Sequence, residues 1–306
     1  MKTIRITTFF LLALLLFKQA EGQYEKVNSN GLDIYYRIFG QGQPILIIGG
    51  GPGDVSDRCL SLCDLLSKNY QCILVDQRGT GKSAPAIFDS TTINIDLTLK
   101  DFEAIREQLG LKDWNVLGFS YGGFLASVYG EKYPSSISSL ITLGSMGFDF
   151  STFRYFSDNI MSKLWQSDLD ALEYWSDSAR YAADTHHAIV ETIRAMMPGY
   201  FFDREKALIE GKNMKDSDFD FEMGNWIWID IQKKYLDFGN KESIFNKPVL
   251  IIQGRQDPTG EAVAINNSNY YKNSTLVFVE KSGHYSWIEQ PEKVLTAINE
   301  FLSINK

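Results

Sequence analysis

Short apolar runs recur along the first half of the chain, and segments with helical periodicity lie between them. Five runs share the length and the β-branched content of buried strands: residues 32–39, 44–49, 72–76, 114–117 and 140–143. Residues 57–68 and 98–109 carry apolar side chains at helical spacing. Strand and helix alternate in this way from residue 45 to residue 144, which predicts an α/β fold with a mostly parallel central sheet and helices on both faces.

The first two runs are separated by Gly40-Gln41-Gly42-Gln43, a short stretch with two glycines. Such a link between two strand-like segments predicts a hairpin that leads into a buried central strand at residues 45–48.

The pattern changes between residues 146 and 243, where strand signals are absent and aromatic residues are dense. These aromatics are Phe148, Phe150, Phe153, Tyr155, Phe156, Trp165, Trp175, Tyr181, Tyr200, Phe201, Trp226 and Trp228. Strand-like runs return at 249–253 and 275–280, and a helix follows at 291–303. We therefore expect a core in two parts, 23–145 and 244–306, with a helical cap at 146–243 inserted before the last strands. Some of the aromatics line a pocket, or else all of them attach the cap to the core.

Composition narrows the class of protein. A chain of 306 residues with 44% hydrophobic content is long enough for one large α/β domain with an insertion. Its net charge of -8, without a basic run, excludes the electrostatic footprint of a nucleic-acid partner.

The first 22 residues are typical of a secretory signal peptide. Lys2 and Arg5 precede an apolar run at 9–17 that is short for a membrane span, and small residues at Ala20 and Gly22 suit a signal peptidase. We expect cleavage after Gly22 and a secreted or periplasmic mature protein with no membrane attachment, and an uncleaved anchor is the alternative.

The cysteines do not indicate a disulfide scaffold or a metal site. Cys59, Cys63 and Cys72 are too few for more than one disulfide, and they have neither C-x-x-C spacing nor a nearby histidine. We expect them to be packed around the first helix, and the sequence implies no metal and no cofactor.

A candidate nucleophile stands where the strand-like run at 114–117 meets a helical segment. Gly118-Phe119-Ser120-Tyr121-Gly122 has the G-x-S-x-G spacing that places a serine on a tight strand-to-helix turn. Glycines at both ends allow the close packing that such a turn needs. The alternative is a glycine turn with a surface serine.

A base and an acid for this serine follow the two last strands. His284 comes after the run at 275–280, whereas the other two histidines, His186 and His187, lie in the helical insertion. Asp257 follows the run at 249–253, and Asp149, after an earlier strand, is its rival. Since loops at the carboxyl edge of a parallel sheet converge, we predict that Ser120, His284 and Asp257 form a catalytic triad.

Two glycine-rich loops flank this predicted site. In Gly49-Gly50-Gly51-Pro52-Gly53 the backbone can approach a ligand, so the N–H groups of Gly51 and Tyr121 are the predicted oxyanion hole. Residues 76–83 contain Gly-Thr-Gly-Lys-Ser but lack the first glycine of a phosphate-binding loop and do not open a helix. We expect Asp76 and Arg78 to hold that loop together by hydrogen bonds.

These motifs resemble the α/β-hydrolases, and most of all their proline iminopeptidase (prolyl aminopeptidase) branch. The similar stretches are Gly50 to Gly53, Asp76 to Ser83, Thr91-Thr92 with Asp101 to Glu103 and Arg106, Gly254 to Asp257, and Ser282 to His284. They span about 30–145 and 245–304. The resemblance implies an α/β-hydrolase fold and a serine hydrolase that releases N-terminal residues from short peptides. The sequence around Ser120 departs from the G-G-S-W-G of that branch and is closer to esterases and lactonases.

An aminopeptidase must also bind a substrate amine, and in the resembling enzymes glutamates of the cap do so. No cap residue here matches them one by one. Glu222 and Asp230 are the candidates, because they lie on roughly one face of a helix beside Trp226 and Trp228. A solvated acidic face is the alternative for both residues. A carboxylesterase or lactonase and a non-catalytic ligand-binding homologue remain the other two hypotheses for the chain, with a small molecule or short peptide as its partner in each case. The oligomeric state stays open.

Overall fold

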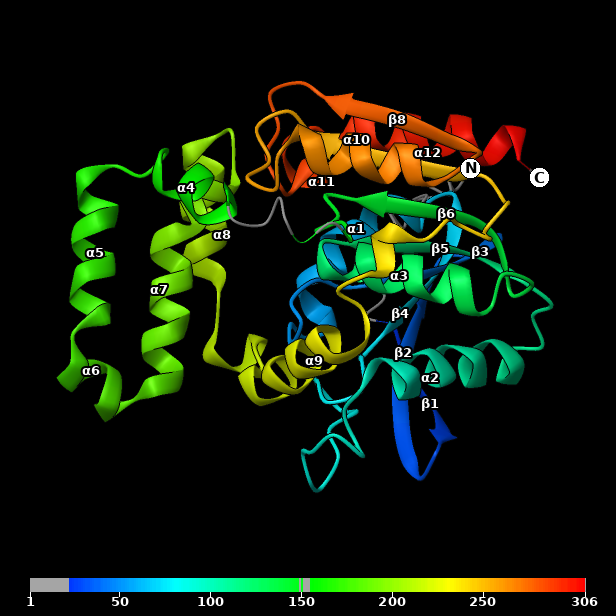
Figure 1. The fold of residues 1–306 in the computed structure, drawn as a ribbon, viewed down its shortest axis with the longest axis horizontal. Coiled ribbons are helices and arrows are strands. Elements are labelled where there is room, and N and C mark those ends of the chain that lie inside the picture. Colours follow the sequence, from blue (N-terminus) through cyan, green and yellow to red (C-terminus); the bar gives the residue numbers. More distant parts are fainter. Residues whose placement is uncertain (1–21, 149, 151–154, 306) are drawn as a thin grey trace, which may run out of the picture.

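The computed structural model describes residues 22–148, 150 and 155–305. Its centre is an eight-stranded sheet with the order β1-β2-β4-β3-β5-β6-β7-β8. The strands are β1 (Tyr24–Ser29), β2 (Leu32–Phe39), β3 (Gln43–Ile48), β4 (Tyr70–Val75), β5 (Trp114–Phe119), β6 (Ile137–Leu143), β7 (Val249–Gly254) and β8 (Ser274–Val279). From β4 to β8 every neighbouring pair is parallel, and only β1 and β2 are antiparallel to their neighbours. This is the mostly parallel α/β architecture that the alternation predicts (Figure 1).

Helices cover both faces of the sheet. Side chains alternate along a strand, so Leu46 and Ile48 of β3 pack with α2 (Ile95–Gln108), α3 (Tyr121–Lys132) and α10 (Glu261–Tyr270). Ile45 and Ile47 point the other way and pack with α1 (Leu60–Leu66), α11 (Ser286–Glu289) and α12 (Pro291–Ile304). Both sets are fully buried, which explains why β3 reads as a continuous apolar run.

The predicted hairpin between residues 32–39 and 44–49 is wrong. β2 pairs with β1 and β4, while β3 lies between β4 and β5. The hairpin instead joins β1 to β2 through Asn30-Gly31, whose φ angles of 51° and 82° suit a two-residue turn. The pattern missed β1 because Tyr24–Ser29 is a largely polar edge strand with only one buried residue.

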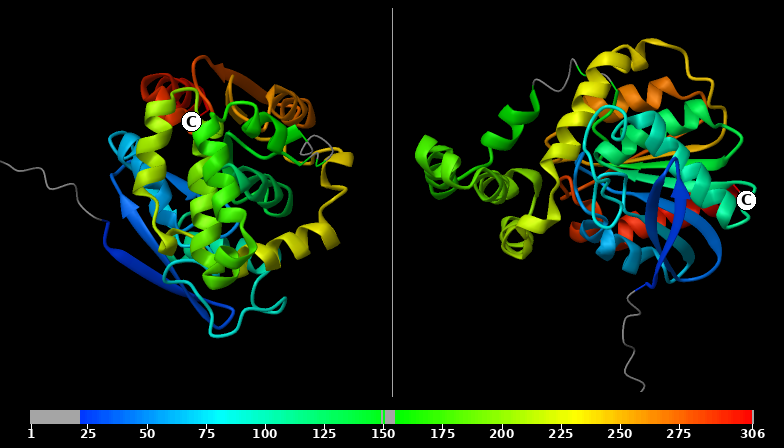
Figure 2. Two further views of the ribbon diagram at one scale, coloured as in Figure 1. Left: turned by 90° about the vertical axis from the view of Figure 1, so that its left-hand side faces the viewer. Right: turned by 90° about the horizontal axis from the view of Figure 1, so that it is seen from below.

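Between β6 and β7 the described residues form helices and no strand. They are α4 (Phe156–Met161), α5 (Gln166–Ser176), α6 (Ser178–Ala183), α7 (Thr185–Tyr200), α8 (Arg204–Asn213) and α9 (Phe221–Lys234). Helices α4 to α8 stand beyond the carboxyl ends of β6 and β8 and project away from the sheet (Figures 1 and 2). In contrast, α9 packs its apolar side on the core cluster that contains α2 and α3.

The loop at 76–83 is held together as the sequence indicates. Asp76 accepts hydrogen bonds from the Ser56 hydroxyl and, at 2.9 Å, from the backbone N–H of Lys82. Arg78 makes two hydrogen bonds of 2.8 and 2.6 Å to the buried carboxylate of Asp101. The loop therefore supports the end of β4 and opens no helix.

All three cysteines are free and buried, as packing around the first helix requires. Cys63 lies on α1 and Cys72 on β4, and burial raises the pKa of the Cys59 thiol to about 12. The Cys59 thiol is therefore a poor nucleophile at neutral pH.

The predicted signal peptide lies outside the described residues, apart from Gly22. Within the part of the chain that the structure describes, every helix is too short or too polar to span a lipid bilayer.

Candidate active site

Ser120 occupies a sharp turn between β5 and α3. Its φ of 55° and ψ of -119° are strained for a residue with a side chain. A Cβ on Gly118 would lie 2.1 Å from the carbonyl oxygen of Gly122, and one on Gly122 would lie 2.3 Å from that of Ile48. Both positions therefore require glycine, and the turn presents the serine at the carboxyl end of the sheet.

The loops after β7 and β8 bring Asp257 and His284 together. His284 Nδ1 lies 2.9 Å from Asp257 Oδ2, and the two residues are only 3% and 5% exposed. The other oxygen of Asp257 accepts hydrogen bonds from the Thr259 N–H at 2.9 Å and the Thr259 hydroxyl at 2.8 Å. An ionised carboxylate can only accept, so Nδ1 carries the imidazole proton and Nε2 is free to act as a base. Asp149, the rival acid, lies outside the described residues.

Ser120 and His284 line one cavity of about 210 Å³. Its walls come from the glycine loop, from α7 and from the segment that leads into α9. Tyr200 and Trp228, two of the aromatics expected at a pocket, lie on this wall. Phe219 and Phe221 also line the cavity, although they were absent from the predicted set. The volume of this cavity lies below the roughly 300–1,000 Å³ of most ligand pockets, so it suits a small acyl or amino-acyl group.

The predicted oxyanion donors flank the serine. Gly51 lines the cavity, and a Cβ on the adjacent Gly50 would lie 3.3 Å from the Cβ of Ser120. Tyr121 is the first residue of α3, where the backbone N–H has no partner within the helix. Its side chain is fully buried in the core, so only the backbone of Tyr121 is available to the site.

Hydrogen bonds join the helical insertion to the loop after β8 that carries His284, the histidine loop. The N–H of His284 donates to the carbonyl of Tyr200 at 2.7 Å, at the end of α7. Glu289 accepts from the N–H of Gly283 at 2.5 Å and from those of residues 202–203 at 2.9 and 2.7 Å. The position of the histidine therefore depends on the chain that leaves α7.

The structure does not bring Glu222 and Asp230 to the cavity. Asp230 accepts a hydrogen bond of 3.0 Å from the N–H of Ile95 and pairs with Lys234 at 2.8 Å. The face of α9 that carries Asp230 packs against the core. The carboxylate therefore stabilises the positive N-terminal end of α2. Glu222 lies on α9 and is also absent from the cavity wall. The hypothesis that these two carboxylates bind a substrate amine is therefore not supported.

Two charged residues that the sequence pattern missed line the cavity instead. Asp54 directly follows the glycine loop, and Arg58 donates from Nε to Asp54 Oδ2 at 3.2 Å. Both side chains are mostly buried, with 17% and 15% of their area exposed. The place of Asp54 directly after Gly53 was the available signal, since residues after such a loop adjoin the site.

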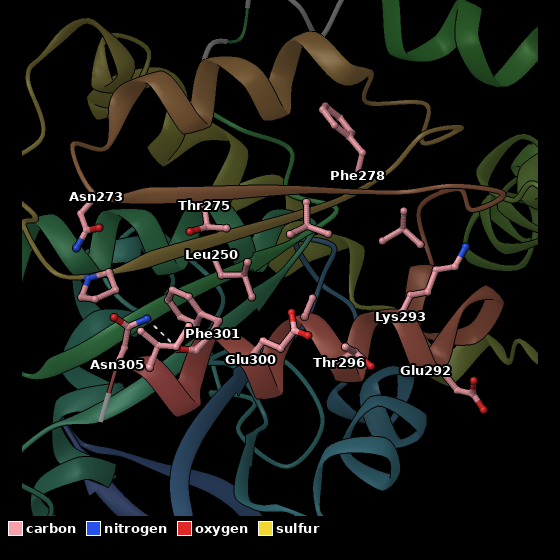
Figure 3. A pocket seen from close by; sticks show the side chains of 15 residues that line it. Leu250, Asn273, Thr275, Phe278, Glu292, Lys293, Thr296, Glu300, Phe301 and Asn305 are labelled. Carbon is pink, nitrogen blue, oxygen red and sulfur yellow. Dashed lines mark hydrogen bonds between the residues drawn. The ribbon is translucent and has the colours of Figure 1, made fainter.

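A larger hollow of about 770 Å³ lies between β8 and α12 (Figure 3). Leu250, Thr275 and Phe301 line it, and none of Ser120, Asp257 and His284 is part of its wall. This hollow is therefore not the candidate active site, although it is larger than the cavity at Ser120.

Comparison with known proteins identifies the family of the chain. The family model described as "alpha/beta hydrolase fold" matches residues 43–291. The proline iminopeptidase of Heyndrickxia coagulans is 28% identical over 285 residues, which cover 86% of this chain and 92% of the relative.

Two solved structures share the fold. A proline iminopeptidase from Mycobacterium smegmatis superposes with a TM-score of 0.66 at 17% identity, covering 92% of this chain and 98% of that one. Est816, described as an N-acyl homoserine lactone degrading enzyme, superposes with a TM-score of 0.66 at 18% identity. The superposition covers 90% of this chain and 100% of Est816. The chain thus belongs to the α/β-hydrolase family, is similar to proline iminopeptidases, and is a hydrolase.

Proposed function

We propose that the chain is a serine aminopeptidase that releases the N-terminal residue of short peptides through an acyl-enzyme. The observation that carries this proposal is the buried Asp257–His284 pair beside Ser120 in a cavity sized for one small residue. The similarity to proline iminopeptidases supports the choice of substrate.

In the proposed reaction, Ser120 Oγ attacks the scissile carbonyl while His284 Nε2 takes its proton. Asp257 holds the other imidazole nitrogen and stabilises the cation that forms. The N–H groups of Gly51 and Tyr121 donate to the oxyanion of the tetrahedral intermediate. The imidazolium then gives its proton to the leaving amine, and water cleaves the acyl-enzyme by the same steps.

A small-molecule esterase or lactonase is the second candidate. Two observations favour it: most of the residues that line the cavity are aromatic or aliphatic, and the sequence around Ser120 departs from that of the iminopeptidase branch. The fold of Est816 is consistent with it as well.

A substrate panel separates the two candidates. We would measure kcat/KM for prolyl and alanyl amides, for their N-acetylated forms and for a neutral acetate ester, with the Ser120→Ala variant as the blank. An aminopeptidase hydrolyses the free-amine amides and rejects the acetylated ones. Equal rates on both forms would eliminate the aminopeptidase and leave the esterase.

We also propose that the protein is exported, on the strength of its N-terminal sequence. Mass determination of the mature N-terminus would test this proposal, because cleavage after Gly22 leaves Gln23 as the first residue.

A further inference from the structure

Asp54 stands out among the charged groups of the cavity. Among the described residues it is the one carboxylate that lines the wall, and Glu222 and Asp230 lie elsewhere. The mechanism proposed above does not use it. A mostly buried carboxylate is costly unless a cation and hydrogen-bond donors meet its oxygens.

Arg58 balances the charge of Asp54 but makes a hydrogen bond to only one of its two oxygens. The guanidinium makes one hydrogen bond to Asp54, through Nε to Oδ2, and a second of 2.9 Å from its NH2 group to the Tyr285 hydroxyl. It also lies 4.9 Å from the ring centre of Phe219. These contacts fix Arg58 on one side of the carboxylate and leave Oδ1 on the other side.

That second oxygen lies next to Gly51, one of the two predicted oxyanion donors. A Cβ built on Gly51 would be 3.3 Å from Asp54 Oδ1. In an amino-acyl substrate the α-nitrogen is two bonds from the scissile carbonyl carbon, a separation of about 2.5 Å. A group that binds this nitrogen must therefore lie beside the oxyanion hole, where Asp54 lies.

Backbone hydrogen bonds hold Asp54 in this place from both sides. The N–H of Asp220 donates to the carbonyl of Gly53 at 2.8 Å, and that of Val55 donates to the carbonyl of Asp218 at 3.0 Å. The segment leading into α9 thus pairs with the chain on either side of Asp54. Such fixation reduces the entropy cost of binding a charged group.

We infer that Asp54 binds the α-ammonium group of the substrate, and so selects substrates with a free N-terminal amine. This inference rests on the proposed aminopeptidase function and names its specificity-determining residue. Bound in this way, the ammonium group donates to Asp54 while the adjacent carbonyl reaches Gly51 and Tyr121. The cation then remains paired in a mostly desolvated cavity.

The test is the ratio of kcat/KM for alanyl amide to that for N-acetyl-alanyl amide, measured with the neutral acetate ester alongside. In Asp54→Asn we expect kcat/KM for the free-amine amide to fall at least thirtyfold, with less than a threefold change on the ester. Asp54→Glu keeps the charge and should recover part of the preference. Asp218→Asn is the matched control, because it removes the same charge nearby from a residue outside the cavity wall.

The outcomes separate the two levels of the proposal. A wild type that hydrolyses free and acetylated amides equally overturns the aminopeptidase function and the role of Asp54 with it. A selective wild type whose Asp54→Asn variant is equally selective overturns the role of Asp54 alone. A uniform loss on amide and ester in that variant would also overturn it, since Asp54 would then only support the cavity.

Discussion

Replacing Asp257 by asparagine tests how the acid controls the histidine. Asp257 Oδ1 faces two donors, the N–H and the hydroxyl of Thr259. The N–H can only donate, and the hydroxyl donates to Asp257 while its oxygen accepts a hydrogen bond of 2.8 Å from Gln253 Nε2. An asparagine must therefore turn its carbonyl oxygen toward Thr259 and its amide nitrogen toward His284 Nδ1.

This orientation forces the wrong imidazole tautomer. The amide nitrogen donates, so Nδ1 must accept and the proton moves to Nε2, which can then no longer take a proton from Ser120. The opposite orientation would set the amide nitrogen against the Thr259 N–H, which can only donate, and would forfeit that buried hydrogen bond, at about 1–3 kcal/mol. Asp257→Asn should therefore lower kcat by about 10³- to 10⁴-fold, or about 4–5.5 kcal/mol in activation free energy.

The assay is kcat and KM on the neutral ester and on alanyl amide, with thermal unfolding as the control for folding. KM should change little, because Asp257 is not part of the cavity wall. Adding Thr259→Val removes one of the two donors, so the double variant should regain up to about tenfold in kcat. A single variant within tenfold of wild type would refute this reasoning.

Three further expectations follow from contacts described above or shown by the same structure. Ser120→Ala should abolish turnover and fluorophosphonate labelling without unfolding the protein, and labelling that persists at another serine would contradict the assignment. Glu289→Ala leaves three backbone N–H groups without their acceptor, so urea denaturation should show a loss of about 3 kcal/mol or more in unfolding free energy, and an unchanged midpoint would argue against it. Arg204 makes two hydrogen bonds to Asp168, and these hold the pKa of Asp168 below its ordinary 3.8. The ion pair therefore adds to the free energy of unfolding above pH 3.8, and this contribution is lost as pH falls through the lower pKa of the folded state. The difference in unfolding free energy between wild type and Asp168→Asn should shrink between about pH 5 and about pH 2.

The sequence was informative for residues whose position is set by the end of a strand. Ser120 and Asp257 follow buried strands and His284 follows the half-buried edge strand β8, and parallel strands place their carboxyl ends at one edge. Periodicity and turn chemistry were therefore enough to predict that these three residues lie at the same sheet edge, far apart as they are in the chain.

Periodicity was not enough where the role of a residue depends on which element packs against its helix. Spacing on a helix correctly sets Glu222 and Asp230 within one helix, but it does not tell which element packs against that helix. The partner of Asp230 is the start of α2, more than a hundred residues earlier in the chain. Asp54 was missed for the opposite reason, because no periodic pattern marks a single carboxylate in a loop, and its neighbour Arg58 forms a cavity wall only in three dimensions.

The hydrogen bonds between the helical insertion and the histidine loop limit how the insertion can be exchanged between related proteins. The insertion enters the chain between β6 and β7, yet its hydrogen bonds attach the end of α7 to the loop after β8. A chimaera that carries another protein's insertion must therefore supply a carbonyl at the place of Tyr200 and two N–H groups for Glu289. Recombination at the two insertion points alone would therefore break the hydrogen bonds that position His284, unless the new insertion places its backbone at the same sites.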